Sequence, residues 1–226
     1  MAYSRGNSKQ IIVGAAALFV SKTAEFDPAN VSPVLPNFTT NVSYRETLTS
    51  ASTVVRNVGY TMNGLELQFQ PDFGEVRVDQ VLDVAKLYKQ GMQVNLATAF
   101  AEATLENLLV AIAASSSDLT SDINISSPLA TSGSGAFADV LDLKSGELGA
   151  CPVERGLIAV GPGTGDCAAG SSIERIYVAY RALSIENVTL SAKRDEASMF
   201  EVSFRLLPAD NGSYGKIVDR TVPAAS

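Results

Sequence analysis

Carboxylates are the side chains of this sequence best suited to chemistry. Two pairs lie four positions apart, Glu75 with Asp79 and Glu102 with Glu106, and a pair of carboxylates is the acid and base of many glycosidases. The first pair falls on the polar side of an expected strand and the second on the polar side of an expected helix, where acidic side chains are usual. No nucleophile and base accompany either pair, so we expect no enzyme activity.

Cofactor and metal chemistry are also poorly supported by the residue types present. The sequence contains no histidine, which removes Ser-His-Asp and Cys-His catalysis and histidine-ligated metals. Cys151 and Cys167 match no zinc spacing and can form a disulfide or stay as two thiols. The run 161–166, GPGTGD, resembles a phosphate loop but lacks the Lys-Ser/Thr that should follow. We expect a flexible turn there, no cofactor and no metal.

Composition narrows the class of protein further. The 226 residues are 46% apolar and 18% charged, which is typical of a globular chain and excludes disorder throughout. The 24 acidic and 17 basic residues give a net charge of −7, which argues against a surface that grips nucleic acid. The apolar run 11–20 follows Arg5 and Lys9 as in a signal peptide, but it is too short to span a bilayer. We interpret it as a strand.

Alternating apolar and polar residues predict a mainly β, antiparallel fold. Asn63-Gly64 is a turn dipeptide, and the next strand alternates apolar residues with Glu66, Gln68 and Gln70. A turn at 71–74 would join it to a strand over 75–79 and complete a hairpin, whereas 81–88 fits a helix or a strand. The other expected strands are 10–21, 91–98, 156–160, 176–182, 185–192, 199–207 and 216–220.

One helix is expected at about 100–114, flanking the sheet. Its apolar residues recur at i, i+3, i+4 and i+7, and they should pack on the sheet with Glu102 and Glu106 on the opposite side. These apolar positions are Leu105, Leu108, Leu109 and Ile112.

Three segments lack a periodic core pattern, although the chain 1–226 is interpreted as a single domain. Residues 1–9 form a basic N-terminal arm, and 23–52 is a long connection rich in Pro, Asn, Ser and Thr. Residues 115–173 hold much of the glycine and of the surplus acid and are interpreted as an inserted segment of loops with one short strand. A connection as long as 23–52 usually contacts something outside its own domain, so we expect it at a subunit interface.

Several stretches together resemble a known family. They are the run 56–70 (RNVGYTMNGLELQFQ), the run 73–80 (FGEVRVDQ), the stretch 93–109 with its AEATLENL, and the closing segments 156–160, 175–177 and 199–207. This order of strands, turns and one helix is similar to that of the major tail tube proteins of long-tailed bacteriophages. The resemblance covers roughly residues 50–114 and 153–220.

The resemblance implies a β-sandwich or barrel-like subunit, six of which form a ring, with the rings stacked into a hollow tube. Inner sheets would line a lumen through which DNA passes without specific binding, since a polar or negative wall does not hold phosphates. Further partners would be the tape measure, terminator and baseplate or tip proteins of the virion tail, assembled in the host cytoplasm without a membrane anchor. The candidate lumen-facing residues are Glu66, Gln68, Glu75, Asp79, Gln93 and Asn95.

Two other classes of protein fit the same pattern. One is another ring-forming virion protein, such as a tail terminator or head-tail adaptor. The other is a secreted β-sandwich module for binding or adhesion, which the six Asn-x-Ser/Thr sequons favour. The absence of tryptophan counts against a carbohydrate-binding surface.

Overall fold

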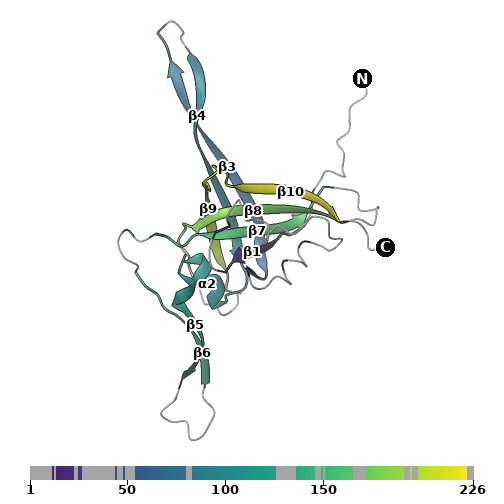
Figure 1. Ribbon diagram of the computed structural model, residues 1–226, viewed down its shortest axis with the longest axis vertical. Coiled ribbons are helices and arrows are strands. Elements are labelled where there is room, and N and C mark those ends of the chain that lie inside the picture. Colours follow the sequence, from purple (N-terminus) through teal and green to yellow (C-terminus); the bar gives the residue numbers. More distant parts are fainter. Residues whose placement is uncertain are drawn as a thin grey trace.

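Antiparallel strands make up most of the structure (Figure 1), a computed structural model in which residues 12, 14–22, 25–26, 44, 48, 54–79, 83–125, 136–145, 149, 151–164, 172–190, 194 and 198–222 are described. The described part contains a large eight-stranded sheet, a separate two-stranded sheet and one short α-helix. The expected mainly β fold with a flanking helix is therefore confirmed. The strands of the large sheet are β1 (Ala17–Ser21), β2 (Val55–Asn57), β3 (Thr61–Arg77), β4 (Val84–Phe100), β7 (Arg155–Pro162), β8 (Ser172–Ser184), β9 (Phe200–Leu207) and β10 (Gly215–Val222).

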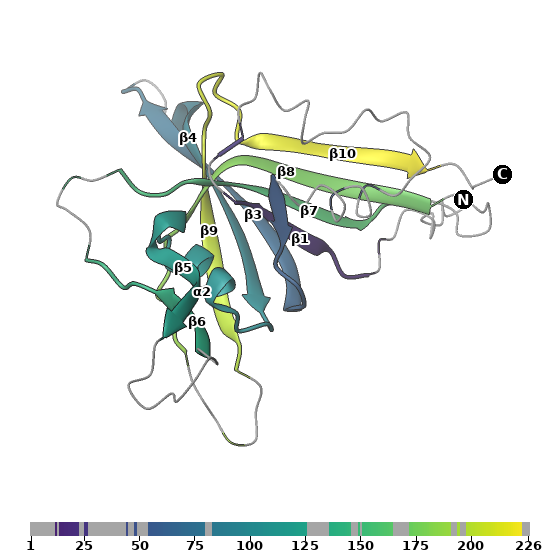
Figure 2. The ribbon, with the colours of Figure 1, turned by 60° about the horizontal axis from the view of Figure 1, so that its bottom comes forward.

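Strand β8 joins the two halves of the large sheet. The strand order is β2-β1-β7-β8-β9-β4-β3, with β10 also paired to β8. Along β8, residues 172–179 pair with β10 and residues 181–184 pair with β9. The sheet therefore divides at β8, and Figure 2 shows β3, β4 and β9 running across β1, β7 and β8.

The main hydrophobic core fills the space between these two halves. From Val94 to Phe100 in β4 and from Phe200 to Leu206 in β9, every second side chain is buried on the core side of the sheet. The Phe100 and Phe200 rings meet edge to face with centroids 5.6 Å apart, a favoured aromatic geometry. The fully buried members include Leu18, Val20, Leu96, Phe100, Leu157, Phe200, Val202 and Phe204.

A second core covers the other face of β1, β7 and β8. Phe19, Ile158 and Tyr180 are fully buried there, which explains why all five residues of β1 are buried and why four of them, Ala17 to Val20, are apolar. Phe26, Tyr44 and Leu48 belong to the connection 23–52, and these three side chains are buried in this second core. Apart from Glu25, the rest of that connection lies outside the described residues, as does the predicted segment 1–9.

The predicted hairpin with a turn at 71–74 is wrong. Strand β3 continues through these residues as one strand of 17 and pairs with β4 from Thr61 to Arg77. Pro71 is tolerated because β3 lies at the edge of the sheet, where a missing N–H breaks no ladder. The dipeptide Asn63-Gly64 is likewise a bulge within β3, since Met62 pairs with Ala99 and Leu65 with Thr98. The sequence of 81–88 fits a helix or a strand, and residues 84–88 form a strand in the structure.

Helix α2 (Leu105–Ala111) is shorter than expected and buries a different face. Thr104 caps it, with its hydroxyl accepting a bond from the Asn107 N–H at 3.2 Å. Leu105 and Ile112, expected in the core, are each 38% exposed, whereas Asn107 is fully buried. The apolar period correctly predicted a helix and the burial of Leu109, but it was wrong for Leu105 and Ile112.

Asn107 is buried because its side-chain amide is fully bonded. Its Nδ2 donates to the carbonyl oxygens of Val58 at 2.8 Å and Glu102 at 2.9 Å. Its Oδ1 accepts from a guanidinium nitrogen of Arg56 at 2.7 Å. These bonds hold α2 to the chain that follows β2, and they offset the cost of burying the amide.

The segment 115–173 contains more regular structure than expected. Strands β5 (Leu119–Ile125) and β6 (Ala136–Leu141) pair as a small sheet that follows α2 and the short 3-10 helix η2 (Ser116–Asp118). The strand predicted at 156–160 is confirmed as β7, which is central in the large sheet. The strand predicted at 185–192 is wrong over 185–190, where the chain leaves the sheet after Ser184.

Replacing Asn107 by alanine should lower the free energy of unfolding by roughly 2–3 kcal/mol, because two buried carbonyls and a guanidinium lose their partner. Urea unfolding of purified protein measures this. Leu105→Ala, in the same helix but exposed, is the matched control and should cost well under 1 kcal/mol, by the rule for surface substitutions. A larger loss for the Leu105 variant would contradict the packing described for α2.

Candidate functional site

A polar surface covers the side of β3, β4 and β9 that faces away from the main core. Gln68 pairs in register with Asn95 and Gln70 with Gln93, so these side chains project from the same face. Gln93 Nε2 donates to Asn95 Oδ1 at 3.4 Å, and Glu66 lies on this face by alternation along β3. The structure thus brings together Glu66, Gln68, Gln93 and Asn95, four of the six candidate lining residues. We call this surface the polar face.

Glu75 and Asp79 do not belong to the polar face. The irregularity between Asp72 and Phe73 leaves an extra residue on β4, so alternation along β3 is uninterrupted there. Glu75 therefore projects on the side of Leu67, and it accepts a bond from Arg77 at 3.0 Å. Asp79 lies beyond the end of β3 in an exposed turn. The prediction placed Glu75 with Glu66 because it assumed a turn at 71–74, whereas in a continuous strand the two residues project from opposite sides.

Strand β9 adds side chains to the polar face that the sequence did not place there. Asn95 pairs with Arg205, Ala97 with Ser203 and Ala99 with Glu201. The alternation along 199–207 is visible in the sequence, but nothing in it shows that β9 pairs with β4. Glu66 and Glu201 are negative and Arg205 is positive, so these three exposed groups give the polar face a net charge of −1.

A two-stranded arm projects from the same strands (Figure 1). Strand β4 pairs with β9 only over Val94–Phe100, so within the described chain residues 70–77 and 84–93 pair with each other alone. We call these residues the arm. Its large apolar side chains are exposed, with Leu87 at 61%, Phe73 at 55% and Tyr88 at 46%. Apolar side chains grouped in this way usually mark a contact with another molecule.

Strand β3 also forms a long free edge. It is the last strand in the sheet order, and no described strand pairs with its outer side. An edge of 17 residues presents a row of backbone N–H and C=O groups that can pair with another chain. The polar face and the free edge therefore adjoin.

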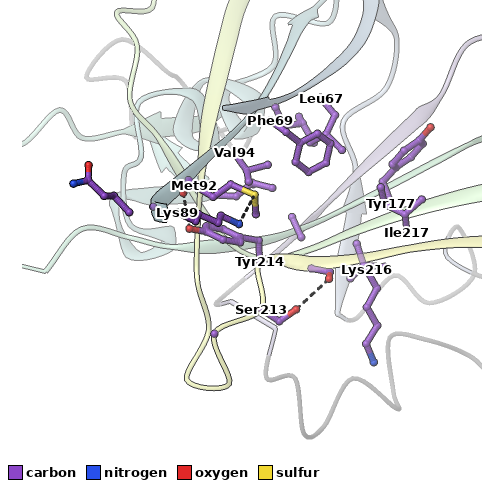
Figure 3. A pocket seen from close by; sticks show the side chains of 18 residues that line it. Leu67, Phe69, Lys89, Met92, Val94, Tyr177, Ser213, Tyr214, Lys216 and Ile217 are labelled. Carbon is purple, nitrogen blue, oxygen red and sulfur yellow. Dashed lines mark hydrogen bonds between the residues drawn. The ribbon is translucent and has the colours of Figure 1, made fainter. Parts of the chain in front are cut away.

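An apolar groove of about 600 Å³ opens at the base of the arm (Figure 3). Its lining comes from β3, β4, β8, β9, β10 and the turn before β10, and includes Leu67, Phe69, Met92, Tyr177, Tyr214 and Ile217. Tyr214 donates its hydroxyl proton to the Met92 carbonyl at 2.6 Å, which fixes the ring against the arm. We call this the basal groove. The lysines on it, Lys89 and Lys216, have no carboxylate or thiol beside them in the lining.

The carboxylates of the second candidate catalytic pair are held in structural contacts. Glu102 Oε1 accepts the Tyr60 N–H at 2.8 Å, and Glu106 Oε2 lies 3.2 Å from Arg56 Nε. Among the described residues no group of three or more His, Cys, Asp or Glu is placed to hold a metal. Cys151 is exposed and Cys167 lies outside the described residues, so both states of the cysteines stay predictions.

No helix in the described ranges is long and apolar enough to cross a membrane. No protein-family model matches this chain, and no curated protein sequence matches it. The resemblance to tail tube proteins therefore rests on the residues quoted for it, and the function is argued below from the polar face, the free edge, the arm and the basal groove.

The bulge at Asn63-Gly64 sets which residues of β3 reach the polar face, and it gives a sharp stability test. Gly64 has φ 75° with open space where a Cβ would stand, so Gly64→Ala should cost about 1 kcal/mol through backbone strain. Gly91 also has open space but no positive φ, so Gly91→Ala should be neutral or slightly stabilising. Thermal and urea unfolding compare the two. Equal effects would mean that the bulge does not form in solution.

Proposed function

We propose that this chain is a structural virion protein that assembles into stacked hexameric rings and so forms the hollow tail tube through which phage DNA is delivered. The observation that supports it best is the free edge of β3, a long strand that carries a polar face on one side and core residues on the other. In that role the chain resides in the virion tail, and its further partners are the tape measure, terminator and baseplate or tip proteins.

Ring formation is the natural use of such an edge. A strand from the next subunit can continue the ladder of β3, so that no β3 edge stays free when the ring closes. Because the core occupies one side of β3, β4 and β9, the polar face becomes one wall of the closed ring. Its lining would then be Glu66, Gln68, Gln93 and Asn95, with Glu201 and Arg205 added from β9.

The chemistry of the polar face suits a wall past which DNA slides. A surface that holds DNA needs several cations against the phosphates. The polar face carries mostly amides, with Arg205 as its cation among the residues assigned to it above. Amides and a small negative charge keep the wall hydrated and do not bind the phosphate backbone of DNA.

The arm and the basal groove supply a second kind of contact between copies. The exposed apolar side chains of the arm include Phe73 and Leu87, and the basal groove is formed by other residues of the same chain. The apolar side chains farther out along the arm can enter the apolar hollow at the base of the arm of a second copy, and such a head-to-tail contact propagates instead of closing as a dimer. We assign this contact to the stacking of one ring on the next.

Electron microscopy of purified protein at rising concentration tests assembly directly. We expect hollow tubes with a regular axial repeat. Single rings that never stack would favour a terminator or head-tail adaptor. A persistent monomer would overturn the proposal, and a monomer that binds glycans would favour the binding or adhesion module.

Changes to the arm should abolish tubes while the subunit stays folded. Phe73→Ser with Leu87→Ser removes two exposed apolar side chains that make no described core contact, so urea unfolding should change by less than about 1 kcal/mol. Tube length in micrographs is the readout. Leu143→Ser, at a residue 78% exposed and outside the arm, is the matched control and should leave tubes intact. Full-length tubes from the double variant would remove the arm from stacking.

Charge reversal distinguishes the two sides of β3. Glu66→Lys places a cation on the polar face, so tubes should form yet retain DNA in a strongly salt-dependent way and impair genome delivery. Glu75→Lys, on the opposite side of the strand, should have a much smaller effect. Retention of labelled DNA by assembled tubes at low and high salt measures this. Equal retention by both variants would contradict the assignment of the polar face to the lumen.

A further inference from the structure

A second cavity gathers positive charge at a place that the proposed function does not use. It has a volume of about 180 Å³ and lies among the end of β1, helix α2 and the start of β7. The charged residues of its lining are Lys22, Arg56, Arg155 and Glu106. Three cations against one carboxylate leave the lining with a net charge of +2, in a chain whose total is −7.

Arg155 is a buried cation bound only by neutral groups. It is 4% exposed, and its terminal nitrogens donate to the carbonyl oxygens of Ser21 at 3.2 Å, Lys22 at 2.9 Å and Ala114 at 3.0 Å. Its Nε is buried and has no hydrogen-bond partner. No carboxylate of the described chain forms an ion pair with it. Burying an unpaired charge is costly, so this arrangement calls for a negative group.

Arg56 presents a second unused donor at the same cavity. Its Nε pairs with Glu106 Oε2 at 3.2 Å, and one terminal nitrogen donates to Asn107 Oδ1 at 2.7 Å. Its other terminal nitrogen is buried without a partner. Two guanidinium groups that line one cavity therefore each keep an unsatisfied N–H.

The electrostatics agree with an anion between these groups. Burial lowers the pKa of Arg155, and the positive charge of Arg56 lowers it further. Burial also lowers the pKa of Arg56, while the charges of Glu106 and Glu102 oppose that shift. An anion would relieve the repulsion and supply acceptors for both unused donors.

We propose that this cavity is a binding site for a small oxyanion, held by Arg155, Arg56 and Lys22. Guanidinium groups donate strong charge-assisted hydrogen bonds to the oxygens of phosphate, sulfate and carboxylate, and each arginine has one unused donor for them. The oxyanion can be a free ion, or it can be the carboxylate of an acidic side chain from a second copy of this chain. The site does not depend on tube formation, because its lining is complete within one chain.

Inorganic phosphate is the probe for the site. Phosphate added at constant ionic strength should raise the melting temperature of the unassembled protein above that in chloride, since a ligand of the folded state stabilises it. Calorimetric titration gives the dissociation constant. Lys22→Gln should weaken binding roughly tenfold, the scale of one charge-assisted hydrogen bond. Lys216→Gln, the same change at an exposed lysine of the basal groove, should leave it unchanged.

Glu106→Gln separates a binding site from a purely structural cluster. It removes the competing carboxylate from the lining, so phosphate should bind more tightly. If the cluster were purely structural, the variant would lose the ion pair with Arg56 and gain no affinity for phosphate. Sedimentation velocity then distinguishes the two sources of the oxyanion. Phosphate that binds and reduces self-association points to a carboxylate of a second copy, and phosphate that binds without this effect points to a free ion. Phosphate that neither binds nor changes association would overturn the proposal, whatever the outcome of the tube experiments.

Discussion

The pairing of β3 with β4 is the interaction on which the rest of the structure depends. Its register puts Val94 and Leu96 into the main core and, on the other side, gathers Gln68, Asn95 and Gln93 into the polar face. A slip of one residue would exchange the two sides and expose the core positions to water. The same ladder continues past the sheet to form the arm. Core, polar face, free edge and arm are thus consequences of one register.

Polar groups in this protein are arranged for two different physical purposes. On the polar face amides predominate and the charges are few, which suits the proposed wall past which DNA slides. In the cavity beside α2, by contrast, Arg56 and Arg155 are withdrawn from water and keep donors unused. The total charge of −7 does not predict the local charge of the polar face or of the cavity beside α2. Local charge, burial and unmet hydrogen bonds decide what each surface can bind.

Much of the strand pattern could be predicted from the sequence, because alternation reports directly on burial. Strand β9 is predicted in this way, whereas β1 is predicted from a continuous apolar run. Pro71 misled the prediction because an edge strand tolerates a proline that a central strand does not. The face of α2 was misplaced because Asn107 is satisfied by groups such as the carbonyl of Val58, far away in the chain. Arg56 and Arg155 give no sequence signal at all, since only tertiary packing brings them to one cavity.

The order in which the strands pair has a consequence for how the chain folds. Strands β3 and β4 are joined by a short connection and can pair early, as local hairpins do. Strand β1 must wait for β7, and β4 for β9, partners that lie far along the chain; such non-local pairings are slow to form. The arm, with its exposed apolar side chains, can therefore form before the main core has closed. Newly made chains are therefore most exposed to misassembly before the core closes, when apolar surface and free strand edges are still open.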